Sequence, residues 1–264
     1  MKSEWKGGRI RSICLTWVAL LALAVLVSGC PAPQRTTLTI SAAASLQGAI
    51  VEAETAFKHD HAETDFQNNF GSSGTLAQEI EQGAPVDAFL SAAAKPMDDL
   101  AAKGLIAPET RKDLLRNSLV LITPNDSKLQ GFEGLADKSV RMIALGDPAS
   151  VPAGQYGQQT LTALHLWDKV NAKFVLGKDV RQVLTYVGTG NADAGLVYAT
   201  DAQASARVRI VAIAPDSSHD PIVYPAAVLK ASRNDASARR FIQYLSSPAA
   251  KAIFVKHGFT IASS

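Results

Sequence analysis

Cysteine is scarce in this sequence, which has two, Cys14 and Cys30, among 264 residues. Cys14 lies inside an apolar run over residues 13–27, near the N-terminus. If that run is removed as part of a leader, Cys30 is the single cysteine that remains. A chain with one cysteine forms no internal disulfide and offers no cluster of thiolates to a metal. The folded protein must therefore depend on its core for stability.

The sequence also lacks a hydrophobic run that is long enough to span a bilayer. The run over residues 13–27 has fifteen residues, whereas a helix needs about 20 to span a bilayer. Basic residues precede it and small residues follow it, which predicts an export signal over residues 1–29. The ending VSGC resembles the bacterial lipoprotein box, which implies cleavage before Cys30 and a lipid on its sulfur. A retained anchor and a free thiol are the alternatives. Residues 30–37 then form a polar tether.

A strong excess of either charge is absent. The sequence has 26 Lys+Arg and 24 Asp+Glu, and residues 1–29 hold four of the basic and one of the acidic residues, so 22 and 23 remain, a net charge of −1. No run of Lys and Arg follows the leader. This balance argues against a nucleic-acid partner. The chain after the leader is long enough for one large domain or two of ordinary size.

Short apolar runs alternate with helical patterns along the rest of the chain, including a helical pattern over residues 157–170. This alternation predicts an α/β fold with parallel sheets. Two apolar runs next to prolines, at residues 117–124 and 221–232, suggest that the chain crosses twice between domains. We expect a discontinuous domain I, residues 38–119 and 225–264, and an inserted domain II, residues 120–224. The two crossings would form a hinge.

The C-terminal helices have clear boundary signals. Ser247 is the expected N-cap, Pro248 the first helical residue, and Gly258 follows the last turn. The aromatic residues Phe241 and Phe254 belong to an apolar stripe, which predicts that they pack in the core.

Five junctions between a strand pattern and a helix pattern are rich in small residues. Unpaired N–H groups at helix starts favour anions, and folds of this class bind ligands at the carboxyl ends of strands. The alternative is that each junction is an ordinary loop and that Ser45 only caps its own helix. The junctions are SAAASL at 41–46, FGSSGTL at 70–76, GDPASVPAGQY at 146–156, KDVRQVL at 178–184 and GLVYATDA at 195–202.

In order and spacing, these motifs closely resemble those of the periplasmic molybdate-binding proteins of ABC transporters, over about residues 37–262. The resemblance implies a two-domain periplasmic-binding-protein fold (type II-like), with two hinge crossovers and the ligand in the interdomain cleft. It also implies one tetrahedral molybdate or tungstate held by neutral donors. These would be the hydroxyl and N–H of Ser45 and Ser73, the N–H of Ala153 and Val180, and the hydroxyl of Tyr198.

The same resemblance implies a role in transport rather than catalysis. The protein would deliver its oxyanion to an ABC permease with its ATPase, as a membrane-anchored, extracytoplasmic monomer. It would need no cofactor, and molybdenum would be held only as the oxyanion, with no direct metal ligand. One departure is the pair Gly71 and Gly74, where family members often carry Ala or Ser. We expect Gly74 to loosen its loop and to affect affinity.

Neutral donors are physically sufficient for this ligand. A dianion that leaves water must regain its solvation energy from oriented dipoles. Charge-assisted hydrogen bonds are about twice as strong as neutral ones, and helix N-termini add a favourable potential. The small residues Ala42, Ala43 and Ala44 let the oxyanion approach the backbone. A site without a carboxylate acceptor disfavours HPO₄²⁻ but not sulfate, so a receptor for sulfate or another tetrahedral oxyanion is the alternative.

Two other classes of function fit the sequence less well. An enzyme would need a catalytic motif, but the five histidines are scattered and neither HExxH nor GxSxG occurs. The segment HDHAE at 59–63 fits a solvated helix end better than a metal site. The sensing half of a transcription regulator would follow a helix-turn-helix, whereas here an export signal comes first.

Overall fold

The structure is a computed structural model that describes residues 1–2 and 35–262. Cys30 and all but the first two residues of the predicted signal peptide lie within residues 3–34, outside the described part. The first strand begins at Thr36, so the last two residues of the predicted tether belong to the fold. None of the helices formed by the described residues has both the length and the apolar character required to cross a membrane.

The described residues form two separate β-sheets flanked by helices. The first sheet has six strands in the order β11-β4-β10-β3-β1-β2. Its strands are β1 (Thr36–Ala43), β2 (Thr64–Gly71), β3 (Ala88–Leu90), β4 (Lys112–Arg116), β10 (Val223–Val228) and β11 (Thr260–Ile261). The accompanying helices are η1 (Ala44–Leu46), α2 (Gln47–Asp60), α3 (Ser73–Glu81), α4 (Ala94–Ala102), η2 (Pro108–Thr110), α9 (Asp235–Tyr244) and α10 (Pro248–Lys256).

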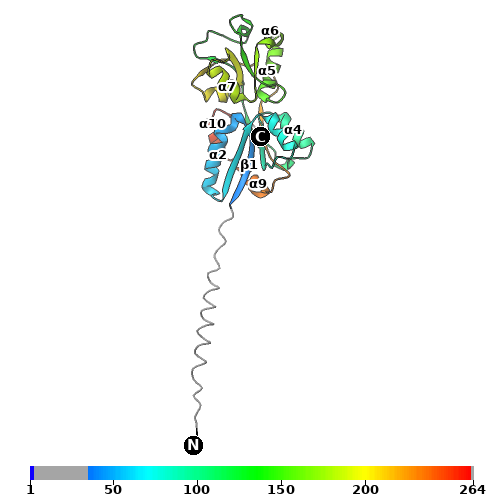
Figure 1. Cartoon of the computed structure of the whole chain (residues 1–264), viewed down its shortest axis with the longest axis vertical. Coiled ribbons are helices and arrows are strands. Elements are labelled where there is room, and N and C mark those ends of the chain that lie inside the picture. Colours follow the sequence, from blue (N-terminus) through cyan, green and yellow to red (C-terminus); the bar gives the residue numbers. More distant parts are fainter. Residues whose placement is uncertain (3–34, 263–264) are drawn as a thin grey trace. The chain divides into compact units, whose positions relative to one another are not determined.

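The second sheet has five strands in the order β7-β6-β8-β5-β9. Figure 1 shows α5, α6 and α7 beside this sheet and α2, α4, α9 and α10 beside the first. The strands are β5 (Leu119–Pro124), β6 (Ile143–Gly146), β7 (Phe174–Gly177), β8 (Ala194–Tyr198) and β9 (Val208–Ile213). The helices are η3 (Glu133–Ala136), α5 (Pro152–Ala163), α6 (Trp167–Val170), η4 (Asn171–Lys173), α7 (Val180–Gly188), α8 (Ala199–Gln203) and η5 (Asp216–Ser218).

The chain passes from the first sheet to the second between β4 and β5, and returns between β9 and β10. The first sheet is therefore formed by the chain before the first crossing and after the second, and the second sheet by the chain between them. The predicted domain I (residues 38–119 and 225–264) and domain II (residues 120–224) stay a prediction. The test would be whether the two parts move relative to each other as units.

The sheets are mixed, whereas the alternating pattern predicts parallel ones. Parallel pairing holds for β1 with β2 and β3, and for β6 with β7 and β8. No helix lies between β4 and β5 at the first crossing, and only the short 3-10 helix η5 lies between β9 and β10 at the second. Accordingly β5 is antiparallel to β8 and β9, and β10 is antiparallel to β3 and β4. The helix predicted over residues 157–170 is broken at His165, whose φ of 55° ends α5 before α6 begins.

The C-terminal signals and the predicted core are confirmed. The Ser247 hydroxyl accepts a hydrogen bond from the backbone N–H of Ala250, Pro248 opens α10, and Gly258 follows it with a φ of 85°. Phe241 and Phe254 are buried. The Phe241 ring packs edge-on against Phe57 of α2 with 5.3 Å between the ring centres, so α9 packs against α2.

Candidate functional site

Five strand ends supply the candidate site. In the first sheet, the parallel neighbours β1 and β2 end at Ala43 and Gly71. In the second, the parallel neighbours β7, β6 and β8 end at Gly177, Gly146 and Tyr198. Each strand leads into a helix start, and parallel neighbours present these ends along one edge of their sheet.

One cavity brings the five predicted residues together. Ser45, Ser73, Ala153, Val180 and Tyr198 all line it, and no charged side chain of the described residues does. The space open to the centre of a water molecule is about 10 Å³, room for roughly one water. The remaining lining residues are small or apolar, namely Ala43, Ala44, Gly71, Ser72, Ala92, Val151 and Pro152.

The start of α3 leaves one N–H available to the cavity. The Ser72 hydroxyl is the N-cap and accepts a hydrogen bond from the N–H of Thr75 at 3.2 Å. The N–H of Gly74 donates to the carbonyl of Ser150 at 3.0 Å. The N–H of Ser73 has no partner among the described residues. Local capping therefore leaves the N–H of Ser73, the second serine of the motif, as the candidate donor.

The start of α5 leaves one N–H in the same way. Pro152, the first helical residue, has no N–H. The N–H of Gly154 donates to the carbonyl of Val151 at 2.9 Å. Between them lies Ala153, whose N–H has no partner among the described residues.

The start of α7 is capped by Asp179. Its carboxylate accepts a hydrogen bond from the N–H of Gln182 at 2.8 Å. Val180, the first residue of α7, lines the cavity and is buried. Its N–H precedes the amides that the cap satisfies, so it is positioned as a donor toward the cavity.

Three hydroxyl groups complete the site. Ser45 does not cap a helix, because neither η1 nor α2 has a side-chain cap. Its Oγ instead lies 3.2 Å from the hydroxyl oxygen of Tyr224. The Ser73 Oγ accepts a hydrogen bond from the N–H of Ala92 at 2.9 Å, which leaves the Ser73 hydrogen free to donate. The Tyr198 hydroxyl donates to the carbonyl of Ala92 at 3.3 Å, a bond that a ligand could replace.

Tyr198 stays protonated over the ordinary pH range. Its side chain is buried, and burial raises the pKa of this phenol well above its usual value. A phenol that keeps its proton is a donor to an anion rather than a competing charge.

A charged pair lies just outside the cavity. The Arg181 Nε donates to the carbonyl of Ala44 at 3.3 Å and lies 3.6 Å from an oxygen of Asp201. Burial raises the pKa of Asp201 to about 7, although Arg181 opposes the shift. Sequence reasoning missed Arg181, Asp201, Ala92 and Tyr224. The segment YPAAV at residues 224–228, within the apolar run of the second crossing, contains Tyr224 and was the available signal for that residue.

Gly74 allows two segments to approach closely, rather than loosening its loop as the sequence suggested. A Cβ built on Gly74 would lie 2.4 Å from the carbonyl oxygen of Ser150. Side chains essentially never approach a backbone oxygen so closely, so any larger residue must displace the segment that contains Ser150. Glycine thus permits the hydrogen bond between α3 and the loop before α5.

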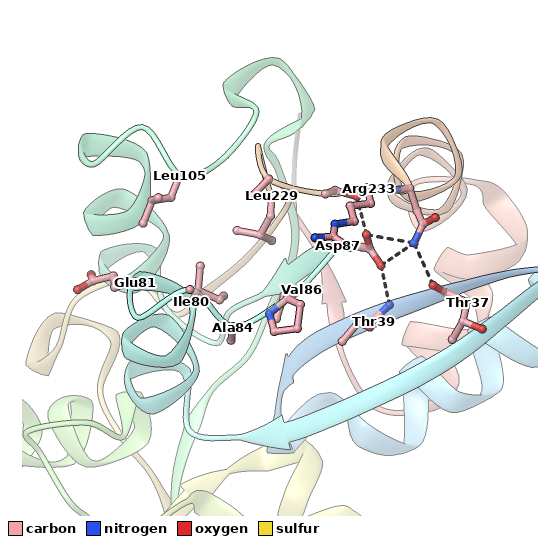
Figure 2. Close-up of a pocket in the computed structure, with 15 residues that line it drawn as sticks. Thr37, Thr39, Ile80, Glu81, Ala84, Val86, Asp87, Leu105, Leu229 and Arg233 are labelled. Carbon is pink, nitrogen blue, oxygen red and sulfur yellow. Dashed lines mark hydrogen bonds between the residues drawn. The ribbon is translucent and has the colours of Figure 1, made fainter.

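A different hollow lies where β1 begins, at the opposite end of that strand from Ser45. Figure 2 shows it, with Asp87 at one side. The Asp87 carboxylate accepts hydrogen bonds from the N–H of Thr39 and the hydroxyl of Ser232. Glu81 also lines this hollow. Among the described residues, Arg233 is the one cationic side chain that lines the hollow, and the two carboxylates outnumber it, so the hollow does not fit an oxyanion.

The histidines near the end of α2 lie beside carboxylates of neighbouring residues. His59 is exposed and its ring lies 3.0 Å from an oxygen of Asp60. Within residues 1–2 and 35–262, no group of three or more His, Cys, Asp or Glu side chains is arranged to hold a metal ion.

Comparison with known proteins agrees with this architecture. The family model described as bacterial extracellular solute-binding protein matches residues 38–260. The molybdate-binding protein ModA of Haemophilus influenzae (strain ATCC 51907 / DSM 11121 / KW20 / Rd) is 41% identical over 228 residues, covering 84% of this chain and 89% of the relative. YvgL of Bacillus subtilis (strain 168), named provisionally as an ABC transporter substrate-binding lipoprotein, is 46% identical over 92% of this chain and 96% of its own length.

A solved structure supports the same assignment. The periplasmic molybdate-binding protein of Azotobacter vinelandii has a TM-score of 0.77 at 27% identity, over 86% of this chain and 100% of that one. The two mixed sheets therefore form the two-domain fold of periplasmic binding proteins. The chain belongs to the bacterial extracellular solute-binding proteins, a family of transport components rather than enzymes.

Proposed function

We propose that this protein captures molybdate, and tungstate by the same chemistry, and delivers it to an ABC importer. The observation that carries the proposal is the cavity in which Ser45, Ser73, Ala153, Val180 and Tyr198 place neutral N–H and O–H groups. Donors without a carboxylate match an oxyanion that has no proton. Two relatives with more than a third of their residues identical carry names of ABC transport or molybdate binding.

Binding is proposed to close domain II onto domain I about the two crossings. Ser45 and Ser73 lie at ends of the first sheet, and Ala153, Val180 and Tyr198 at ends of the second. The cavity of about 10 Å³ is too small for a tetrahedral oxyanion to enter without movement. A ligand that contacts both sides stabilises the closed form.

We further propose that the mature protein is an extracytoplasmic monomer tethered to a membrane by a lipid on Cys30. The motif VSGC and the lipoprotein name of the Bacillus subtilis relative support this. The ABC permease with its ATPase would be its partner, and no cofactor is required.

Isothermal titration tests the ligand assignment. Metal-free protein would be titrated with molybdate, tungstate, sulfate and phosphate at a pH where molybdate carries no proton. We expect tight binding of one molybdate or tungstate per chain and little heat with phosphate. Tighter binding of sulfate than of molybdate would replace the proposal with the sulfate alternative, and no heat with any of them would refute an oxyanion receptor.

A further inference from the structure

A chain of hydrogen-bonding groups runs from the first crossing to the cavity. Asn117 lies between β4 and β5, and its Nδ2 donates to the hydroxyl oxygen of Tyr224 at 3.2 Å. That hydroxyl lies 3.2 Å from the Oγ of Ser45, which lines the cavity. The Nδ2 also donates to the Thr200 hydroxyl of α8 at 2.9 Å. Asn117 therefore contacts elements of both sheets.

The orientation of the Asn117 amide is fixed by its neighbour. The N–H of Ser118 donates to the Asn117 Oδ1 at 2.9 Å. A backbone N–H can only donate, so the oxygen of the amide must face Ser118 and the NH₂ group must face Tyr224. The Tyr224 oxygen then accepts from Asn117, and its own hydrogen is available to the Ser45 Oγ.

We propose that Tyr224 is a positioning residue for oxyanion binding: held by Asn117, it donates to the Ser45 Oγ and so directs the Ser45 hydrogen into the cavity. The inference rests on the proposed function and assigns one residue that the five-donor site does not include. Without Tyr224, the Ser45 hydroxyl can rotate and donate elsewhere. Part of the affinity due to Ser45 is thus set by a residue that does not line the cavity.

The surroundings of Tyr224 support a role for its hydroxyl separate from packing. Its ring is 1% exposed and packs edge-on against the rings of Tyr198 at 5.7 Å and Phe259 at 5.4 Å. Burial and the nearby Asp201 raise the pKa of this phenol well above its usual range, so its proton is retained. Phenylalanine would keep the ring contacts and remove only the hydrogen bonds.

A double-mutant cycle tests the relay. The dissociation constant for molybdate would be measured by isothermal titration for wild type, Tyr224→Phe, Ser45→Ala and the double variant. We expect Tyr224→Phe to weaken binding about two- to tenfold in the wild-type background, the loss of one neutral hydrogen bond. It should change binding less than twofold in the Ser45→Ala background, because the hydroxyl that it orients is gone.

Tyr244→Phe is the matched control. The Tyr244 hydroxyl has no hydrogen-bond partner among the described residues, so its removal should leave molybdate binding unchanged. Melting of each ligand-free variant shows whether it folds. If Tyr224→Phe does not fold, Asn117→Ala can replace it, because that substitution removes the donor to Tyr224. It should weaken molybdate binding when Ser45 is present and leave it unchanged in Ser45→Ala.

The outcomes separate the two proposals. If wild type binds molybdate and Tyr224→Phe binds it equally well, the relay is overturned and the oxyanion site stands. The same conclusion follows if Tyr224→Phe weakens binding equally in wild type and in Ser45→Ala. A wild-type protein that binds no oxyanion would overturn the proposed function, and the relay with it.

Discussion

The contact between Gly74 and Ser150 makes a strong prediction about affinity. The N–H of Gly74 donates to the Ser150 carbonyl, and this bond links α3 of the first sheet to the loop before α5 of the second. Replacing Gly74 by alanine places a methyl group 2.4 Å from that oxygen and 3.0 Å from the Ser150 carbonyl carbon. Both atoms belong to the backbone, so no side chain can rotate away.

The magnitude follows from the distances. Carbon atoms are in best contact at about 3.5–4.0 Å, so the two segments must separate by roughly 1 Å. Forcing an extra methyl group into a packed region costs about 1–3 kcal/mol. If that cost falls on the ligand-bound, closed form, molybdate binding weakens by about five- to 150-fold. If the free protein opens as proposed, it avoids most of this cost.

Titration with molybdate measures this loss, and Gly188→Ala provides the control. Gly188 ends α7 and does not line the cavity, and a Cβ there would lie 3.4 Å from the Cβ of Arg207, an ordinary contact. We expect Gly188→Ala to bind within about twofold of wild type, less than the weakest loss that overpacking predicts. If Gly74→Ala also binds like wild type, the close approach to Ser150 does not contribute to affinity and the reasoning fails.

Three further predictions address the site, a buried carboxyl group and the leader. Ser73→Ala should weaken molybdate binding by about 1.5–3 kcal/mol, whereas Val180→Ala should change it little because its donor is main chain; titration showing the reverse order would contradict the site. Burial raises the pKa of Glu54 to about 7, so its ionisation opposes folding as pH rises from about 4.5 to above 7. Glu54→Gln should leave the melting temperature unchanged near pH 4 and raise it at pH 8. The gain at pH 8 corresponds to up to about 3 kcal/mol in the free energy of unfolding. The same pH profile in both proteins would refute this, with Glu79→Gln, whose hydrogen bond to Asn69 is exposed, as control. Cys30→Ala should release the protein from membranes on fractionation, since lipid burial contributes about 0.8 kcal/mol per CH₂; full retention would favour an uncleaved anchor.

Sequence patterns predicted the elements that local chemistry determines. The start of α10 follows from Ser247 and Pro248, and the five helix starts of the site follow from their small residues. The short strands β4, β7 and β11 were missed. β11 is the edge strand of the first sheet, β4 lies next to it, and β7 is an edge strand of the second sheet. Strands this short give little periodic signal.

The contacts within the site could be predicted only in part. Resemblance to a family identified Ser73 as the donor, but the sequence alone does not distinguish it from Ser72, since either serine can cap a helix. The distinction comes from the Ser72 cap and from the Gly74 contact with Ser150, which is 76 positions away in sequence. The pair Asn117 and Tyr224 is separated by 107 positions, and no local pattern relates two such side chains.

The use of main-chain donors affects where affinity can be altered. Substitution of Ala153 or Val180 by any residue other than proline keeps the backbone N–H, so such substitutions change binding only by changing the shape of the site. Larger control must come from residues that determine how closely the segments approach or how a hydroxyl is oriented. Gly74 acts on the first of these and Tyr224 on the second. A selection for variants with altered molybdate affinity should therefore recover substitutions at Gly74 and Tyr224 more often than at Val180, and sequencing of the selected pool would measure that ratio.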